Sequence, residues 1–491
     1  MRHPLYITTP EVTAARATVH VQAEVFTAAK ERDARIVRRV TDPQGNVVLH
    51  DTVTARLSTQ LQGTETQLPD ISIAQPQLWS CETPALYDLQ LSLLSPDGSV
   101  ADEASHKFGI RTIEYDPAFG FKLNGKKVLL KGIANHHTLG ALGAACYDRA
   151  ILKRLQLLKN FGLNHVRTSH NPYSVSLLEM CDSLGILVCD ELYDKWLTQY
   201  AGGRTPWESL WQRDINEWMR RDRSHPCVVM WSLGNELQTY PQLPYHDGGV
   251  TPYLMQKPVA KRLDSTRPLT VAMHPRGRNP QTDSLPCDLA KLTDIQAYNY
   301  RYMYFPGDRA KFPYMNFYQS EATVSAMGPN WFGMELDKVI GAAYWGLIDY
   351  LGESDGWPAK GWNKGVFDIS LEPKPQAYLL KSIFSAEPTV HIGIVESDRQ
   401  LEWNGAQVGT MGMSEIWNRP EGSQVDLYTY TNADEVELLL NGKSLGVKQN
   451  SDKAQDRCKI RWNKVSYQPG RLEAIARTGG KIVARPTIET T

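Results

Sequence analysis

The most restrictive feature of this chain is the alternation of helical patterns with short apolar runs between residues 148 and 236. In "DRAILKRLQLLKNFG", apolar residues recur at helical spacing from Ile151 to Phe161, and Asp148 and Gly162 are the expected cap and stop. The strand "LNHVRTSH" follows. The same order then repeats, with "SVSLLEMCDSLG" before "ILVCDE" and "PWESLWQRDINEWMRRDRSHP" before "CVVMWSLGNE". This alternation predicts a parallel sheet with helical crossovers.

The length of this zone favours a barrel. Residues 118–388 come close to the roughly 250 residues of a (β/α)8 barrel. A doubly wound open sheet is the competing architecture, but no glycine-rich phosphate loop follows any of the strands. We therefore predict a (β/α)8 TIM barrel over residues 118–388.

The two ends of the chain have a different periodicity. "ATVHVQAEVF" alternates with period two, and "EVELLLNGKSLG" turns at Asn441-Gly442, a strong hairpin signal. Such short strands with frequent turns are typical of small antiparallel sandwiches. The predicted fold is therefore multidomain, a TIM barrel flanked by two immunoglobulin-like β-sandwich domains, residues 1–117 and 389–491.

Composition excludes several functional classes. The net charge is −1 with no long run of one sign, so the sequence does not predict a nucleic-acid partner or a membrane-surface partner. No stretch has the roughly 18 apolar residues of a membrane span. Seven scattered cysteines without a C-x-x-C pair indicate neither a disulfide framework nor a zinc knuckle. The compartment, cytoplasmic or periplasmic, and the formation of a homo-oligomer stay open.

Polar residues end three consecutive predicted strands. In a barrel, the carboxyl ends of the strands open onto one face, where active sites are built. A glutamate at the end of a core strand is either ion-paired or a tuned catalytic acid, and the acids of the second strand could instead pair with the arginine of the first. The strand-end residues are Arg167 and His170, then Asp190 and Glu191, then Asn235 and Glu236.

A second carboxylate, Glu321, follows the apolar-aromatic run "YMNFYQS". Two carboxylates from different strands can perform retaining glycoside hydrolysis, one as acid/base and the other as nucleophile. That scheme needs no cofactor. Aromatic residues at further strand ends, Tyr298, Tyr300 and Trp345, suit the C–H faces of a sugar ring, although each of them could simply fill the core.

With these residues in view, the chain resembles glycoside hydrolase family 2, close to its β-galactosidase branch. The matching stretches keep the family order from residue 108 to residue 382. They are "FGIRTIE", "FKLNGKKVLLKGIANHH", "LGALGAA", "VRTSHNPYS", "CDSLGILVCDE", "RRDRSHPCVVMWSLGNE", "AYNY", "QSEA", "DYLGES" and "PKPQAYLLKS". The family's flanking immunoglobulin-like sandwiches resemble both end zones.

The resemblance implies a role for individual residues. Glu236 matches the family acid/base and Glu321 the nucleophile, with Asn235 toward the sugar 2-hydroxyl and Arg167 keeping Glu321 ionised. Tyr300 matches the tyrosine that steadies the nucleophile, and Trp345 the floor of the sugar subsite. The remaining substrate-binding candidates are His136, His170, Asp190 and Asn363.

Departures from the family pattern bear on metals and on domain content. Metal-dependent members carry a glutamate and a histidine after the "DE" strand end, whereas this chain has "LYDKWL", so no magnesium site is expected. A metal pair at His136 and His137 lacks a third ligand at sensible spacing. Family members usually begin with a jelly-roll domain, and this sequence begins at the sandwich that follows it.

The resemblance implies a retaining exo-β-glycosidase with a glycoside or oligosaccharide substrate, and terminal β-D-galactose is the favoured sugar. A β-glucuronidase is the runner-up: that branch uses an N-x-K triplet, and the aligned "WNK" retains Lys364 but replaces the leading asparagine by Trp362. A β-mannosidase is a weaker third reading. A non-hydrolytic carbohydrate-binding relative is the alternative from another class.

Overall fold

A closed parallel barrel forms the centre of the molecule in the computed structural model, which describes residues 5–27, 32–59, 65–201, 203–237, 242–274, 286–354, 356–397, 402–403, 406–407 and 411–490. Within these residues the strands pair in chain order, and the last strand closes on the first. They are β12 (Leu130–Asn135), β13 (His165–Thr168), β14 (Leu187–Glu191), β15 (Val228–Asn235), β16 (Leu269–Met273), β17 (Gln296–Asn299), β18 (Phe317–Ala322) and β19 (Gly341–Trp345). The predicted barrel is therefore confirmed.

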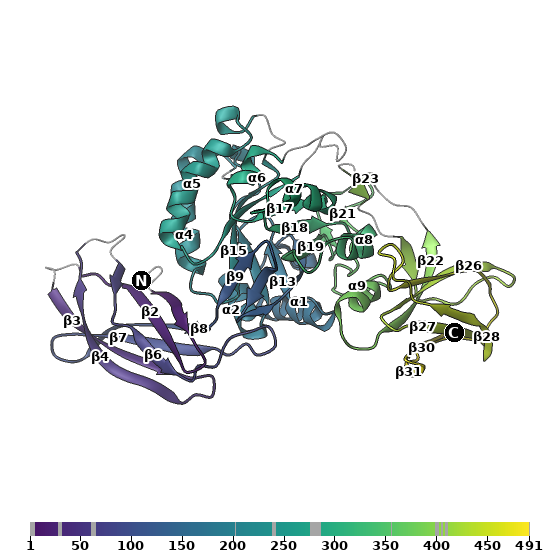
Figure 1. Ribbon diagram of the computed structural model, residues 1–491, viewed down its shortest axis with the longest axis horizontal. Helices are drawn as coiled ribbons and strands as arrows, with labels where there is room; N and C mark the ends of the chain where they lie inside the picture. Colours follow the sequence, from purple (N-terminus) through teal and green to yellow (C-terminus); the bar gives the residue numbers. More distant parts are fainter. Residues whose placement is uncertain are drawn as a thin grey trace.

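Helices cover the outside of the barrel (Figure 1). The helix α2 (Val175–Leu184) has the bounds that its sequence predicts. The side chain of Ser174 caps its start by accepting a hydrogen bond from the amide of Leu177, and Gly185, in the left-handed conformation, follows its last residue. The prediction that Asp148 caps α1 (Asp148–Asn160) is wrong: Asp148 is the first helical residue and Tyr147 stands at the cap without a side-chain bond. The other helices are α3 (Thr198–Ala201), α4 (Trp207–Asp222), α5 (Val250–Leu263), α6 (Asp288–Leu292), α7 (Phe305–Lys311), α8 (Met327–Phe332) and α9 (Ala377–Phe384).

The N-terminal zone folds into two antiparallel sheets around a shared core. The inward residues Val19 and Val21 are fully buried, as their period-two pattern predicts. One sheet holds β1 (Leu5–Val12), β2 (Arg16–Glu24), β5 (Glu65–Gln67) and β6 (Ile71–Ala74). The other holds β3 (Arg32–Thr41), β4 (Val47–Leu57), β7 (Tyr87–Leu94) and β8 (Val100–Phe108). A small sheet of β9 (Ile113–Asp116), β10 (Gly120–Leu123) and β11 (Lys126–Lys127) leads into the barrel.

This N-terminal sandwich contacts the barrel at the amino ends of its strands. The buried indole of Trp79 donates to the carbonyl of Asp182, in the last turn of α2, at 2.8 Å. Arg111 donates to the carbonyls of Pro226 and Val228 at the start of β15, at 2.6 and 2.7 Å. The sandwich therefore supports the barrel on the face opposite the carboxyl ends of the strands.

The C-terminal zone is a second pair of antiparallel sheets, on the far side of the barrel from the first (Figure 1). One sheet contains β22 (Val390–Ser397), β25 (Gly412–Ser414), β26 (Gln424–Thr431) and β29 (Lys459–Ser466). The other contains β27 (Glu435–Leu440), β28 (Lys443–Gln449), β30 (Arg471–Thr478), β31 (Lys481–Ala484) and β32 (Thr487–Glu489). Two short ribbons pair β20 (Tyr350–Leu351) with β21 (Gly361–Trp362) and β23 (Glu402–Trp403) with β24 (Ala406–Gln407). The predicted hairpin turn at Asn441 and Gly442 has positive φ at both residues.

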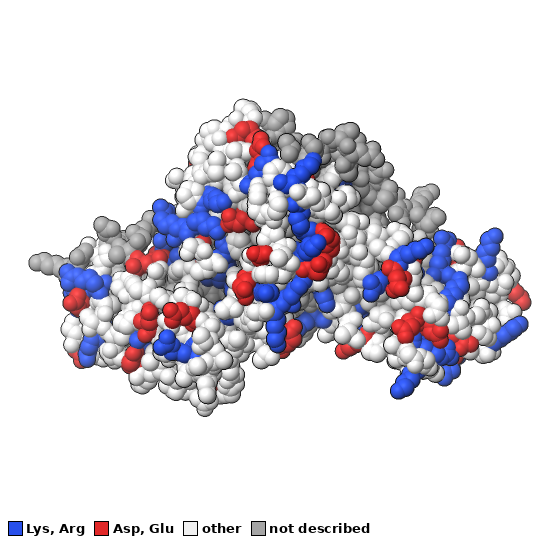
Figure 2. All heavy atoms as spheres, viewed as in Figure 1, with Lys and Arg blue, Asp and Glu red and all other residues white. Residues whose placement is uncertain are grey.

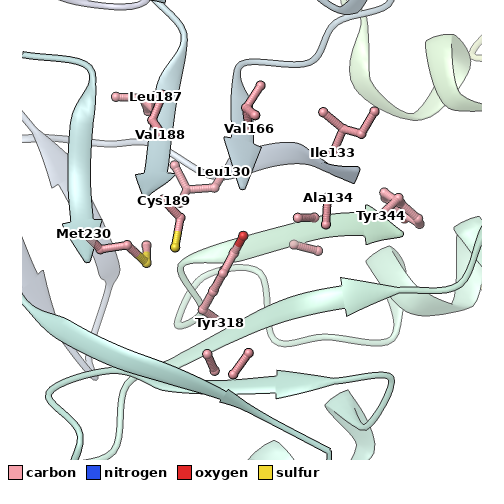
Figure 3. Packing of buried hydrophobic residues seen from close by; sticks show 14 of the residues in the cluster. Leu130, Ile133, Ala134, Val166, Leu187, Val188, Cys189, Met230, Tyr318 and Tyr344 are labelled. Carbon is pink, nitrogen blue, oxygen red and sulfur yellow. The ribbon is translucent and has the colours of Figure 1, made fainter. Parts of the chain in front are cut away.

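The interior of the barrel is packed with side chains. Figure 3 shows Cys189, Met230 and Tyr318 directed toward one another inside the ring of strands, and all three are fully buried. The hydroxyl of Tyr318 lies 2.7 Å from Nε2 of His165, so the polar groups of this layer satisfy each other. The barrel is closed below the site by this core.

On the face shown in Figure 2, both signs of charge are interspersed over all three parts of the molecule. Of the helices that the structure describes, none has both the length and the apolar character needed to cross a membrane.

Candidate active site

The carboxyl ends of the barrel strands bring Glu236 and Glu321 together. Glu236 directly follows β15, and Glu321 lies near the end of β18. Both residues are almost completely buried: Glu236 is 7% exposed and Glu321 is 3% exposed. The charge of Glu236 affects the ionisation of Glu321, so the two carboxyl groups lie within electrostatic reach of each other.

Local irregularities of the strands aim these side chains. The regular register is interrupted between Ser232 and Asn235 where β15 pairs with β16, and between Gln319 and Ala322 where β18 pairs with β19. Glu236 has φ of 52°, in the left-handed region that non-glycine residues rarely adopt. Its amide donates to the carbonyl of Ala272 at 2.6 Å, so the neighbouring strand holds this conformation.

Arg167 connects two acidic residues beneath the site. Its Nη1 donates to Oε1 of Glu321 at 2.9 Å, and its Nε and Nη2 donate to Oε2 of Glu191 at 3.0 and 2.8 Å. The side chain is completely buried. Although burial opposes it, the two carboxylates raise the pKa of the guanidinium, so Arg167 stays cationic.

Two further groups contact the carboxylate of Glu321. The hydroxyl of Tyr300 donates to its Oε2 at 2.5 Å, and Nε2 of His170 lies 3.5 Å from its Oε1. Burial raises the pKa of Tyr300 far above its usual range, and the nearby glutamates add to the effect, so the hydroxyl remains a donor. Glu321 is therefore fixed by a guanidinium, a phenol and an imidazole.

Glu236 has a different environment. The Nδ2 of Asn299 lies 3.2 Å from its Oε1, and the same nitrogen donates to Oδ1 of Asn235 at 2.9 Å. Asn235 also accepts from Nη2 of Arg167 at 3.0 Å and donates to Asp194 at 3.0 Å. The side-chain amide of Asn235 is thereby held by Asn299, Arg167 and Asp194.

The surroundings of Glu321 act on its pKa in opposite directions. Burial raises the pKa of Glu321 above the ordinary glutamate value, and the negative charge of Glu236 contributes in the same direction. Arg167, His170 and the hydroxyl of Tyr300 oppose this rise because they stabilise the ionised form. The direct contact with the guanidinium of Arg167 therefore stabilises the ionised form of Glu321.

Aromatic side chains line one side of the site. Trp345, at the end of β19, stacks on the ring of His170 with centroids 5.2 Å apart and planes 11° apart. His136 meets the same indole edge-on at 5.0 Å. The structure therefore brings together Glu236, Glu321, Asn235, Arg167, His170, Tyr300, Trp345 and His136, which sequence analysis had selected.

Two predicted site residues make other contacts. Asp190 points outward: its Oδ2 accepts from the indole of Trp218 in α4 at 2.8 Å, and its Oδ1 accepts from Thr168 at 3.0 Å. Asn363 is exposed, and its carbonyl accepts from Lys374 at 3.2 Å. Neither side chain has a recorded contact with the two glutamates in the described part of the chain.

Two inward-facing residues are not among the predicted catalytic or substrate-binding residues. Glu191, which sequence analysis names as a strand-end residue and as a possible partner of Arg167, does bind Arg167 and also lies 2.6 Å from Nδ1 of His170. Asn299 lies between the two tyrosines of "AYNY". Because side chains alternate along a strand, Glu191 shares the face of the core residue Cys189, but the apolar run "ILVC" before the two acids does not indicate which face is inward.

Among the residues that the structure describes, no cluster of three or more histidine, cysteine or acidic side chains is arranged to hold a metal ion. His136 and His137 diverge. His136 faces Trp345, whereas His137 packs against Tyr173 at 4.7 Å and approaches Sγ of Cys146 at 3.3 Å.

Comparison with known families agrees with this geometry. Models described as "Glycosyl hydrolases family 2" and "Glycosyl hydrolases family 2, TIM barrel domain" match residues 5–111 and 119–307, the second including Glu236. The chain belongs to glycoside hydrolase family 2. A third model, "Domain of unknown function (DUF4982)", matches residues 422–484 in the C-terminal sandwich of this family 2 protein.

Relatives of this glycoside hydrolase family 2 protein differ in their names. A β-galactosidase of Bacteroides ovatus is 29% identical over 99% of the chain and 62% of its own length. A putative β-glucuronidase of Formosa agariphila is 28% identical over 99% of the chain and 48% of its own length. The crystal structure of a family 2 member from Bacteroides cellulosilyticus superposes with a TM-score of 0.85 at 32% identity, over 100% of this chain and 63% of that one. The chain thus spans less than two thirds of these relatives.

Proposed function

We propose that this protein is a retaining exo-β-glycosidase that releases terminal β-D-galactose, with Glu321 as nucleophile and Glu236 as acid/base. The observation that carries the proposal is the environment of Glu321. Arg167 and Tyr300 stabilise the ionised form of Glu321 and orient it, as a nucleophile requires. Glu236, at the end of another strand, is the second carboxylate that a retaining mechanism needs.

The proposed reaction has two displacement steps. In the first, an oxygen of Glu321 bonds to the anomeric carbon while the glycosidic bond breaks and Glu236 gives its proton to the leaving oxygen. In the second, Glu236 removes a proton from water, the water oxygen bonds to the anomeric carbon, and the ester to Glu321 breaks. Both inversions together return the β configuration, and the enzyme recovers its original protonation.

The other residues of the site would position the sugar. Trp345 offers an aromatic face for the C–H face of the ring, and Asn235 stands beside the acid/base toward the 2-hydroxyl. His136 and His170 supply polar groups for further hydroxyls. Hydrogen bonds of this kind contribute most when they strengthen in the transition state.

A β-D-glucuronide is the second candidate substrate. The observations in its favour are the names of several relatives and the presence of Lys364 in the triplet "WNK". The ammonium of Lys364 lies 5.0 Å from the ring centroid of Trp362, and the residue is only 8% exposed. We favour the galactoside.

The test is hydrolysis of nitrophenyl β-D-galactoside and β-D-glucuronide by the wild type and by Glu236→Gln and Glu321→Gln variants. The proposal expects galactoside turnover that both substitutions reduce by several orders of magnitude. Trapping with a 2-deoxy-2-fluoro galactoside should attach the sugar to Glu321, which peptide mass spectrometry locates.

The exposed Glu387, on the connection from α9 to β22, provides the matched control. The variant Glu387→Gln should keep wild-type turnover. Turnover that survives Glu321→Gln, or a label on another residue, would refute the assignment of the nucleophile. A preference for the glucuronide would replace the proposed sugar.

A further inference from the structure

Glu353 is a carboxylate at the edge of the site for which the proposed mechanism has no role. It lies on the loop that follows β20, and its φ is 48°. Its Oε2 accepts from the hydroxyl of Tyr350 at 2.5 Å, and its Oε1 lies 3.3 Å from Nε2 of His136. A non-glycine residue in the left-handed region needs such support, so the carboxylate occupies a defined position.

A short series of side-chain contacts connects Glu353 with Glu321, the proposed nucleophile. His136 meets the indole of Trp345 at 5.0 Å, Trp345 stacks on His170 at 5.2 Å, and Nε2 of His170 lies 3.5 Å from Glu321. The side chain of Glu353 is 45% exposed. It therefore combines contact with the proposed sugar-binding residues and access from solvent.

Glu353 also adds negative charge to a site that already contains several carboxylates. Although partial burial opposes it, hydrogen bonds from His136 and Tyr350 hold the pKa of Glu353 below the ordinary glutamate value. The carboxylate is therefore ionised in the neutral range. In the same site, the guanidinium of Arg167 is already engaged by Glu191 and Glu321.

The residues behind Glu353 suit a neutral ligand. Tyr350, which holds the carboxylate, stacks on Trp362 with centroids 6.0 Å apart and planes 6° apart. The ammonium of Lys364 lies 5.0 Å from the ring centroid of Trp362, and Lys364 is buried. Glu353 thus presents an exposed negative charge beside these aromatic rings.

We infer that Glu353 determines the sugar specificity of the site, because it accepts a hydrogen bond from a hydroxyl of a neutral sugar and repels the carboxylate of a uronic acid. The inference rests on the proposed function, since it names the class of sugar that the same site takes. Like charges brought together in a partly desolvated site disfavour binding strongly, and such repulsion is an efficient way to reject a competitor.

The test is the variant Glu353→Gln, which removes the charge, keeps the size of the side chain and replaces one of its two acceptor oxygens by an amide donor. We expect the ratio of kcat/KM for nitrophenyl β-D-glucuronide to that for the β-D-galactoside to rise about tenfold or more. The loss on the galactoside should appear mainly in KM, because the residue binds the sugar and does not take part in proton transfer. An unchanged ratio would overturn the inference.

The control is Glu387→Gln, which removes one negative charge from an exposed side chain outside the barrel mouth and should leave the ratio unchanged. Calorimetric binding of free D-galactose and D-glucuronate separates this inference from the proposed hydrolysis. If no glycoside is hydrolysed, the proposed function fails, and a gain in D-glucuronate affinity in Glu353→Gln would still support the inference. Equal D-glucuronate affinity in wild type and variant would overturn it.

Discussion

A single guanidinium serves two carboxylates in this site, and neither partner is exposed to solvent. Arg167 binds Glu191 through two nitrogens and Glu321 through a third. A buried charge without a partner is costly, so this arrangement requires all three residues together. Glu191 thus helps to orient the guanidinium of Arg167. The guanidinium in turn orients Glu321 through the hydrogen bond from Nη1.

The hydroxyl of Tyr300 provides a prediction at the same scale. In Tyr300→Phe we expect kcat for the galactoside to fall by about ten- to a hundredfold, because a hydrogen bond to a charged group contributes roughly 1.5–3 kcal/mol. Steady-state kinetics measure the change. The matched control is Tyr298→Phe on the same strand, whose hydroxyl donates to Asp308 in α7, 2.8 Å away. Equal losses of kcat in both variants would contradict the proposed role.

The pH dependence of activity follows from the ionisation of Glu321. Its pKa is raised by burial and by Glu236, and the nucleophile must be ionised, so activity is present above this pKa and is lost as the pH falls through it. The acid limb of kcat/KM should therefore lie above the ordinary glutamate pKa of about 4.3. In Tyr300→Phe the limb should move to still higher pH, because a donor to the ionised form is lost. A limb that stays in place in that variant would argue against Glu321 as the titrating group.

At the scale of the strands, the alternation of side chains along β14 determines which of two adjacent acids faces the site. In β14, Cys189 and Glu191 point into the barrel, whereas Asp190 points to the surrounding helices. Burial and the neighbouring Asp222 raise the pKa of Asp190 well above its usual range, and it binds Trp218 of α4. Adjacent acids in one strand therefore have separate roles.

Because Asp190 points away from the site, we expect it to contribute to the stability of the fold and not to activity. We expect Asp190→Ala to lower the free energy of unfolding by about 1–3 kcal/mol, because the indole of Trp218 loses its buried partner. The kcat and KM for the galactoside should stay within about twofold of wild type. Chemical denaturation and steady-state kinetics check the two statements, and a large rise in KM with little change in stability would instead place Asp190 in the sugar site.

At the scale of the whole molecule, the N-terminal sandwich and the catalytic face lie at opposite ends of the barrel. Trp79 is completely buried where the sandwich meets the barrel, and its indole donates to Asp182. Arg223 and Glu65 form an ion pair across the same contact. The sandwich therefore stabilises the barrel without approaching Glu236 or Glu321 from this side.

Truncation of Trp79 tests this arrangement. We expect Trp79→Ala to lower stability by about 3–5 kcal/mol and to make the connection near residue 117 sensitive to limited proteolysis, while kcat of the folded fraction is retained. Trp417→Ala, an equally buried indole in the C-terminal sandwich, is the matched control. It should also destabilise the protein, but it should not release an N-terminal fragment of about 117 residues. Release in both variants would contradict a local docking role for Trp79.

The sequence by itself determined the architecture and most of the site. Helical and period-two patterns identify the barrel and the two sandwiches, because each pattern buries one face of its element. Polar residues after apolar strands identify Arg167, Asn235, Glu236 and Glu321, because the carboxyl ends of parallel strands meet at one face. The family resemblance added the roles of these residues, which remain proposals.

Only the tertiary structure decided which neighbours share the site. It separated Asp190 from Glu191, because the face of the strand on which each side chain lies depends on the pairing register. Irregular pairing, as between β14, β15 and β16, can shift that register. It also brought Glu353 to His136, residues 217 positions apart in the chain. Contacts of that range depend on how the last strand closes against the first, and no local pattern in the sequence encodes that closure.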